Sequence, residues 1–504
     1  MKMTRASGIL LHVSSLPGRY GIGNLGQPAR EFVDFLAAAG QRYWQFLPLG
    51  PTAAIAANSP YMSYSAFAGN PLFIDFDKLA DDGLISRAVL AAAPDFSEYR
   101  VDFSKVKSFA EQILNLAFTE FSARAGSPDF ADFCRREPWL DDYALFMALR
   151  EEHDFRAWYE WPAAVAGRRA EVLDSWRRKL AGRIDFHRFC QYCFFSQWDE
   201  LKNYANGRGV ALIGDIPIYV AHDSVDVWAN PGCFRLDPVT LAPTHVAGVP
   251  PDYFSATGQR WGNPLYRWKN GAESNRQLYA WWGERFRAMF RQADICRIDH
   301  FRGFESFWEI DFQEETAVNG RWGKGPGQAF FDDMAEHIGE LPIIAEDLGQ
   351  ITPEVDKLRR DCGFPGMKVL QFAFDSEEKN PYLPHNYQST NSVVYTGTHD
   401  NDTTLGWFTG GHVSPECRER VKRYLHSDGA DISRDFIRLA LSSVAGLAIF
   451  PLQDVLGFGA DCRMNRPGTV AGNWQWRCAP RFIRGEVATW LRDETGFYNR
   501  LRSS

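Results

Sequence analysis

Eight short apolar runs recur along the chain, and this recurrence restricts the fold more than any other feature. The runs are residues 8–13, 44–49, 210–215, 293–299, 343–347, 368–372, 393–398 and 447–452. Their length and character are typical of strands buried on both faces of a parallel sheet. Between the first two runs, apolar side chains recur at helical spacing over residues 32–39, and Gly40 stands where a helix would stop. Eight strands with helical crossovers predict a (β/α)8 TIM barrel of the α/β class, and a doubly wound open sheet is the alternative.

The spacing between the runs is uneven, which locates two insertions. The first, residues 72–205, is mainly helical in pattern: after Ser104, apolar side chains share one helical face until Gly126. The second, residues 221–290, is rich in Pro, Gly, Trp and Tyr, and we expect it to border a cleft. No exposed linker marks a second domain. Residues 1–504 are therefore predicted to form a single barrel unit, with both insertions around the C-terminal face of the strands.

The charge balance restricts the partners. The chain has 55 Lys and Arg against 63 Asp and Glu, a net charge of −8, without basic blocks. This balance argues against nucleic acid as the main partner. No run approaches the ~18 apolar residues of a membrane span, and the first residues become polar too quickly for a signal peptide. We therefore expect a cytoplasmic protein that binds neither nucleic acid nor a membrane; its oligomeric state cannot be read from the sequence.

The cysteines and glycines give no sign of a bound group. Nine cysteines are too few and too scattered for a disulfide scaffold. Cys190 and Cys193 form a C-x-x-C between phenylalanines, which we interpret as reduced core thiols rather than as a zinc or redox site. His and Cys spacings typical of a metal site are lacking, as is a good phosphate-binding glycine loop. We predict no cofactor and no metal, with a calcium ion bound at an insertion as the open alternative.

Three predicted strands end in a carboxylate: Asp299, Glu346 and Asp400. In a barrel, the C-terminal strand ends surround one mouth, where chemistry takes place. Arg297 lies on the same face of its strand as Asp299, and a cation there favours the ionised carboxylate. Since neighbouring strands are about 4.8 Å apart, the carboxyl groups of Asp299 and Glu346 are expected roughly 5 Å apart, as in a retaining glycosidase. The alternative is that these carboxylates cap helices or form ion pairs in loops. That alternative would suffice for a single strand-end carboxylate, but three of them together favour a functional site.

The segments around these carboxylates carry a family resemblance. Residues 297–303 (RIDHFRG), 345–349 (AEDLG) and 398–403 (THDNDT) resemble the catalytic segments of the 4-α-glucanotransferases, glycoside hydrolase family 77 of the α-amylase clan. The resemblance spans most of the chain, because further similar segments follow in the same order. These are residues 7–12, 59–61, 65–71, 214–217, 261–264 and 465–469.

This resemblance implies a retaining 4-α-glucanotransferase that moves α-1,4-glucan segments between maltooligosaccharides, or to glucose, by double displacement. It implies that Asp299 is the nucleophile that forms a glucosyl–enzyme, and that Glu346 is the general acid and then the base. Asp400 would bind ring hydroxyls and favour a distorted sugar. Burial near Ile344 and Leu348, together with the charge of Asp299, should raise the pKa of Glu346.

The resemblance also indicates a set of substrate-binding residues. These are Arg297, His399, Tyr61, Ser59, Trp261, Gly262, Asn263, Asp215, Pro250 and Asn465. Some have a structural alternative: Tyr61 as a core tyrosine, Asp215 as a partner of neighbouring backbone, and Asn465 as a turn residue. At position 62 the chain has Met where the family more often has Gln, so a polar sugar contact there is not expected.

The same first half-reaction serves transfer and hydrolysis, and the outcome depends on access of water. Residues 248–255, with two prolines and two aromatics, are predicted to cover the cleft and so to favour transfer. Two other functions stay open at this stage. One is an α-amylase-like α-1,4-glucan hydrolase, and the other is a non-catalytic glucan-binding barrel protein.

Overall fold

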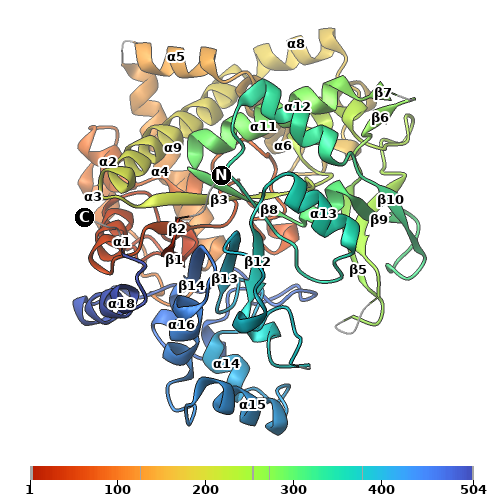
Figure 1. Cartoon of the computed structure of the whole chain (residues 1–504). Helices are drawn as coiled ribbons and strands as arrows, with labels where there is room; N and C mark the ends of the chain where they lie inside the picture. Colours follow the sequence, from red (N-terminus) through yellow and green to blue (C-terminus); the bar gives the residue numbers. More distant parts are fainter. Residues whose placement is uncertain (1–3, 125, 252–254, 272, 377, 502–504) are drawn as a thin grey trace.

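Eight parallel strands close into a barrel that helices surround (Figure 1). The strands are β1 Ala6–Leu10, β2 Tyr43–Gln45, β3 Ala211–Pro217, β8 Ile295–Asp299, β11 Ile343–Ala345, β12 Gly366–Val369, β13 Ser392–Tyr395 and β14 Leu447–Pro451. They follow the order of the chain around the barrel, and the last pairs with the first, with Leu447 opposite Ala6. The predicted TIM barrel is confirmed, and the open-sheet alternative is wrong. This computed structural model describes residues 4–124, 126–251, 255–271, 273–376 and 378–501.

Helices connect the strands on the outside of the barrel. They are α1 Gln27–Ala38, α9 Ala181–Gly207, α11 Arg276–Gln292, α12 Gln328–Ile338, α13 Pro353–Asp361, α14 Thr404–Thr409, α15 Pro415–Leu425, α16 Ile432–Ser442, α17 Leu452–Val455 and α18 Gly485–Phe497. In α1, Phe32 and Leu36 are fully buried, and Gly40 follows the helix with a φ of 68°, a conformation that glycine adopts without strain. The helix and its stop are as predicted. Between β12 and β13, the described residues form the 3-10 turns Leu370–Phe372 and Pro384–Asn386 in place of an α-helix.

The stretch predicted as the first insertion is helical. Before α9 it contains α2 Phe76–Asp81, α3 Arg87–Ala91, α4 Phe103–Ala123, α5 Pro128–Arg136, α6 Trp139–Glu152, α7 Ala163–Ala166 and α8 Ala170–Lys179. The helix expected after Ser104 begins slightly earlier, because the side chain of Asp102 caps it by accepting from the Lys105 N–H at 3.1 Å. It also ends at Ala123, ahead of the expected stop at Gly126.

A second, antiparallel sheet lies beside the barrel, at the right of Figure 1. Its strand order is β10 Gly320–Lys324, β9 Ser306–Asp311, β4 His245–Val249 and β5 Gln259–Pro264. The strands β6 Lys269–Asn270 and β7 Glu273–Ser274 form a small hairpin, and α10 Val225–Ala229 precedes them. Part of this sheet comes from the second predicted insertion and part from the connection between β8 and β11. The sequence reading did not foresee it, and it forms one flank of the site described below.

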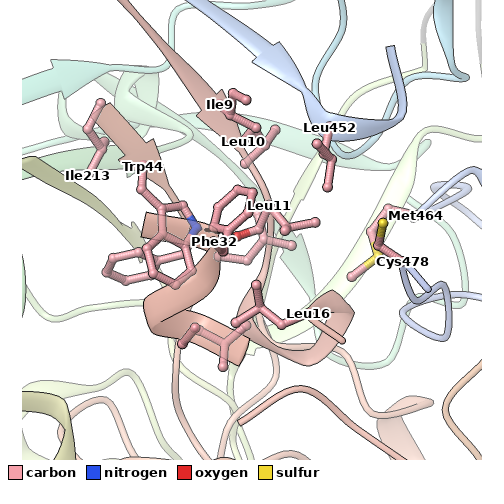
Figure 2. Close-up of a cluster of buried hydrophobic side chains, with 14 of the residues drawn as sticks. Ile9, Leu10, Leu11, Leu16, Phe32, Trp44, Ile213, Leu452, Met464 and Cys478 are labelled. Atoms are coloured by element: carbon pink, nitrogen blue, oxygen red, sulfur yellow. Dashed lines mark hydrogen bonds between the residues drawn. The ribbon is translucent and has the colours of Figure 1, made fainter. Parts of the chain in front are cut away.

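An apolar core joins the barrel to its outer helices (Figure 2). Trp44 on β2 is fully buried, and its indole N–H donates to the Leu11 carbonyl at 2.8 Å. Phe32 of α1 meets the Trp44 ring edge-on, with centroids 5.1 Å apart. Burying a side chain of this kind contributes about 1.5–3 kcal/mol. These contacts fix α1 to the first strands and so hold the barrel wall in place.

Two further predictions, on the cysteines and on membrane-spanning segments, can be compared with the structure. Each of the nine cysteines is free in the described part of the chain. Cys190 and Cys193 are buried on α9, and burial raises the pKa of both thiols, which keeps them protonated. Over the described ranges, no helix has both the length and the apolar character needed to cross a bilayer.

Candidate active site

Asp299 and Glu346 stand at the ends of two neighbouring barrel strands. Asp299 is the last residue of β8, and Glu346 directly follows β11. The strands pair with Ile298 opposite Ala345, and the Glu346 N–H donates to the Ile298 carbonyl at 3.0 Å. Because adjacent strands lie about 4.8 Å apart, the two carboxylates share one side of the barrel mouth, the position expected from the sequence.

The backbone fixes the side chain of Glu346 on both oxygens. The N–H of His300 donates to Oε2 at 2.7 Å, and the N–H of Leu348 donates to Oε1 at 2.7 Å. His300 has a φ of 53°, a left-handed conformation that is uncommon outside glycine. Strained backbone of this kind concentrates at functional sites. His300 directly follows Asp299 but is not among the site residues predicted from the sequence.

The protonation state of Glu346 follows from its surroundings. Burial and the negative charge of Asp299 raise the pKa of Glu346 to about 8, against the opposing effects of Arg297 and the two backbone N–H groups. Near neutral pH the carboxyl group is therefore largely protonated. This is the direction expected from the sequence, and it suits a general acid.

Arg297 connects two carboxylates in the floor of the site. Its Nη2 lies 2.8 Å from Oδ1 of Asp299, and its Nη1 lies 2.8 Å from both carboxylate oxygens of Asp215. Arg297 and Asp215 are almost fully buried. Burial alone lowers the pKa of Arg297, but Asp215 and Asp299 raise it well above its usual value, so the guanidinium stays charged. Asp299 thus lies in an ion pair with a permanently charged partner.

Tyr61 closes the floor above Asp215. Its hydroxyl donates to Oδ2 of Asp215 at 2.8 Å, and burial, with the charge of Asp215, raises the pKa of Tyr61 well above its ordinary value. The ring stacks on His399, with centroids 5.1 Å apart and an angle of 18°. Ser59 shapes the turn before it, since its Oγ accepts from the Tyr61 N–H at 3.3 Å. One face of Tyr61 is thus already covered, and its hydroxyl stays protonated as a donor.

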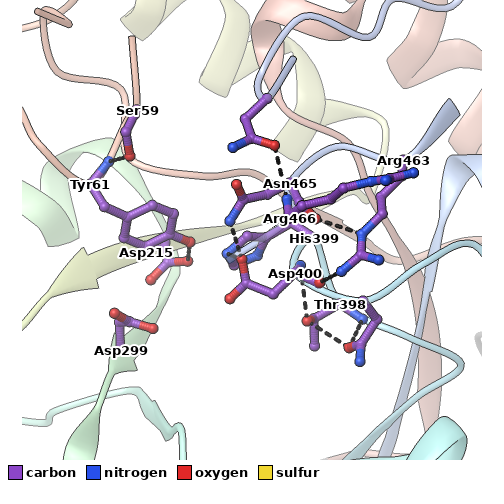
Figure 3. A network of polar contacts seen from close by, with 12 residues as sticks. Ser59, Tyr61, Asp215, Asp299, Thr398, His399, Asp400, Arg463, Asn465 and Arg466 are labelled. Atoms are coloured by element: carbon purple, nitrogen blue, oxygen red, sulfur yellow. Dashed lines mark hydrogen bonds and ion pairs between the residues drawn. The ribbon is translucent and has the colours of Figure 1, made fainter. Parts of the chain in front are cut away.

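Asp400 lies across the site, in the loop after β13. Figure 3 shows it beside Asn465, with Asp299 and Asp215 on the opposite side. Oδ1 of Asp400 accepts from Asn465 Nδ2 at 2.6 Å and lies 3.3 Å from Nε2 of His399. Its side chain remains 45% exposed and is therefore accessible to a ligand. Asn465 therefore holds Asp400 directly, beyond any role in its own turn.

The antiparallel sheet supplies a wall next to His300. The indole ring of Trp261, on β5, meets the His300 ring edge-on, with centroids 4.8 Å apart. Gly262 has a φ of 82°, which a side chain would strain. Asn263 is nearly buried; its Nδ2 donates to the Val220 carbonyl at 2.8 Å and lies 3.5 Å from the sulfur of Met62. Met62 thus packs against Asn263.

Two further predictions concern the loop after β4. Pro250 follows Val249, the last residue of β4, and is partly exposed. The cover expected over residues 248–255 falls in part on residues 252–254, which lie outside the described residues. The cover therefore stays a prediction.

Two residues of the site escaped the sequence analysis. Arg463 donates to the backbone carbonyls of Asp400 at 2.6 Å and of Asn465 at 2.7 Å, which joins the two loops (Figure 3). The Trp474 ring lies 5.9 Å from that of Tyr61 and 6.0 Å from that of His399. Both residues flank the segment 465–469, whose neighbourhood could have drawn attention to them. Among the described residues, no cluster of three or more His, Cys, Asp or Glu side chains is placed to hold a metal ion.

Comparison with known proteins gives one consistent family. The family model "4-alpha-glucanotransferase" matches residues 11–482. A 4-alpha-glucanotransferase of Synechocystis sp. is 51% identical over 505 residues, which cover 99% of this chain and 97% of that protein. One of Thermus thermophilus is 48% identical over 503 residues, 98% of each chain. The solved amylomaltase from Streptococcus agalactiae in complex with acarbose has a TM-score of 0.94 at 39% identity, covering 99% of this chain and 100% of that one.

Proposed function

The chain belongs to the 4-alpha-glucanotransferase family, and on that premise we propose that it transfers α-1,4-glucan segments between maltooligosaccharides, and to glucose, by a retaining double displacement. The observation that carries the mechanism is the contrast between two neighbouring carboxyl groups. Glu346 has a pKa raised to about 8, whereas Asp299 lies in an ion pair with Arg297. One group is thus poised to give a proton and the other to attack as an anion.

In the first step, a carboxylate oxygen of Asp299 attacks the anomeric carbon and forms an ester bond to it. The glycosidic C–O bond breaks, and Glu346 gives its proton to the departing oxygen. In the second step, the carboxylate of Glu346 takes the proton of an acceptor 4-hydroxyl. That oxygen attacks the same carbon, which releases Asp299 and restores the original configuration.

The supporting residues act on charge and on the sugar ring. Arg297, held by Asp215, stabilises the carboxylate of Asp299 before attack and after release. Asp400, held by Asn465 and beside His399, binds hydroxyl groups of the ring that is transferred. Hydrogen bonds that strengthen as the ring distorts favour the oxocarbenium-like transition state.

Trp261, Gly262, Asn263 and Pro250 are proposed to line the acceptor side. Trp261, Gly262 and Asn263 lie on β5, where Trp261 packs against His300, and Pro250 directly follows β4. A wall that binds sugar and excludes water favours the acceptor hydroxyl over hydrolysis. The α-amylase-like hydrolase is the alternative that shares the first step, and enzyme-family membership argues against the non-catalytic barrel. Cytoplasmic location and the absence of cofactors stay predictions.

Product analysis with maltotriose tests this function. We expect glucose and a series of longer maltooligosaccharides, with little gain in total reducing ends. Equimolar release of glucose and maltose with a steady gain in reducing ends would instead identify a hydrolase. Trapping the intermediate on Asp299 with a slow fluoro-sugar donor, and its loss in Asp299→Asn, tests the covalent step separately.

A further inference from the structure

Trp322 presents a large ring to solvent on the antiparallel sheet. It lies on β10, an edge strand, and 44% of its surface is exposed. Among the described residues, which include all 17 tryptophans, it is the most exposed one. The exposed part of the ring offers a flat apolar surface on which a ligand can stack.

The ring of Trp322 is held in place rather than free. Trp308, directly opposite on β9, meets it edge-on with centroids 5.1 Å apart. Gly320 makes room for this pair, because a Cβ atom there would lie 2.2 Å from Nε1 of Trp308. The guanidinium of Arg302 covers one side of Trp322, 4.0 Å from the ring centroid. A rigid ring loses little entropy when a ligand stacks on its open surface.

Arg302 ties Trp322 to the catalytic loops. It lies three residues after Asp299, and it donates to the carbonyl of Gln350, four residues after Glu346. Arg302 itself is only 6% exposed. Burial lowers its pKa, and the negative charges of Glu305 and Glu346 oppose that effect.

Arg302 connects Trp322 to the loop that follows Glu346. Glu346 protonates the oxygen that leaves, so the leaving glucan, and later the acceptor, extends from the Glu346 side of the site. Asp400 and Asn465, proposed above to bind the transferred ring, lie across the site from Asp299 (Figure 3). Trp322 follows Asp299 and precedes Glu346 in the chain, and it contacts the loops of both through Arg302.

We propose that Trp322 forms an additional acceptor-side subsite that stacks on one pyranose ring of an α-1,4-glucan, beyond the glucose units next to the reacting bond. The inference rests on the proposed function. Pyranose rings expose C–H faces, and an indole ring offers a complementary flat apolar surface. A subsite at this place makes the enzyme favour long acceptors over glucose.

Acceptor kinetics test the subsite. With one donor, Trp322→Ala should raise the KM for a maltopentaose acceptor about three- to tenfold, the effect of one aromatic contact. The KM for glucose and the kcat should change less than about twofold, because glucose cannot reach Trp322. Trp322→Phe should restore most of the maltopentaose KM. An equal change for both acceptors, or no change for either, overturns the subsite.

Binding without turnover gives a second readout. In the inactive Glu346→Gln background, Trp322→Ala should weaken maltoheptaose binding by a similar factor in calorimetry, and unchanged affinity overturns the proposal. Phe497→Ala removes an 82% exposed ring on α18, outside the site, and serves as the matched control. Trp322→Lys replaces Trp322→Ala if the latter does not fold. If the parent enzyme does not convert maltotriose into glucans of greater length, the proposed function is wrong. If it makes such glucans and the Trp322 variants behave like the parent, only the subsite proposal is wrong.

Discussion

The backbone N–H of His300 donates a 2.7 Å hydrogen bond to the carboxyl group of Glu346. The residue after the proposed nucleophile thus positions the proposed acid. The turn between β8 and the 3-10 helix η6 (Phe301–Phe304) carries both Asp299 and the His300 N–H. The hydrogen bond therefore couples the position of the Glu346 carboxyl group to that of Asp299. A fixed separation between nucleophile and acid is what a double displacement requires.

Removing the acid should separate the two halves of the reaction. Glu346→Gln should lower kcat for maltotriose disproportionation by about 10²–10⁴-fold, because no proton reaches the departing oxygen. With α-glucosyl fluoride as donor, whose leaving group needs little help, the loss should be far smaller. Initial rates with both donors check this, and an equal loss with both would contradict an acid role for Glu346.

The pH profile should be bell-shaped. Glu346 must start protonated, and its pKa is raised to about 8, so kcat/KM should fall as the pH rises through about 8. Asp299 must be ionised, so the rate should fall again in acid. Measurements of kcat/KM between about pH 4 and 9 cover both limbs. A rate that stays constant across the alkaline half would remove Glu346 from the mechanism.

Glu346 should also make stability depend on pH. Its pKa rises from 4.5 in the unfolded chain to about 8 in the folded one, so the folded state holds the proton more tightly. The carboxyl group therefore destabilises the fold progressively as the pH rises from about 4.5 to 8. Glu346→Gln, which cannot ionise, should raise Tm more at pH 8 than at pH 5. Calorimetric scans at both values check this, and an equal Tm difference would refute it.

Arg297 should matter for stability as well as for activity. Arg297→Met leaves Asp215 buried without its partner, which should cost about 3–5 kcal/mol of unfolding free energy. Arg287→Met breaks the exposed pair with Glu284 and should cost at most about 1 kcal/mol. Urea unfolding measures both. Adding Asp215→Asn to Arg297→Met should recover part of the loss; no recovery would mean that the pair is not the cause.

The Trp261 wall should control the fate of the intermediate. Trp261→Ala removes the ring that packs on His300 and admits water, so hydrolysis should gain several-fold relative to transfer. Trp261→Phe keeps an aromatic wall and should stay close to the parent. The ratio of new reducing ends to glucan products measures the effect. An unaltered ratio in Trp261→Ala would exclude this ring from water control.

The barrel was predictable because each of its strands is a buried apolar run, whose pattern is local. Some strands differ in extent from their apolar runs. The run at 44–49 contributes only the short strand β2, Tyr43–Gln45, and Pro48 within the run has no N–H to donate to a neighbouring strand. The antiparallel sheet was not predictable in this way. Gly320–Lys324 has exposed charged residues and glycines, and the pairing of His245–Val249 with Ser306–Asp311 joins segments far apart in the chain.

In the candidate site, too, the features that follow from local sequence could be predicted and those that depend on tertiary contacts could not. Strand-end carboxylates can be placed from sequence, because parallel strands bring their C-terminal ends to one mouth. The left-handed turn at His300 and the donors of Arg463 depend on tertiary contacts that no spacing reveals. Only part of the role of Arg297 could be predicted. The alternation of side chains along a strand places Arg297 on the same face as Asp299, but its second partner, Asp215, comes from another strand.

Because Ala6 on β1 pairs with Leu447 on β14, the barrel cannot close until β14 has been synthesised. During synthesis, a growing chain would carry seven strands with two open edges and would lack Asn465, the residue that holds Asp400. A ribosome that stops early should therefore release an inert, aggregation-prone product rather than a partly active one. Activity should appear only after β14 and the segment that contains Asn465 have been synthesised.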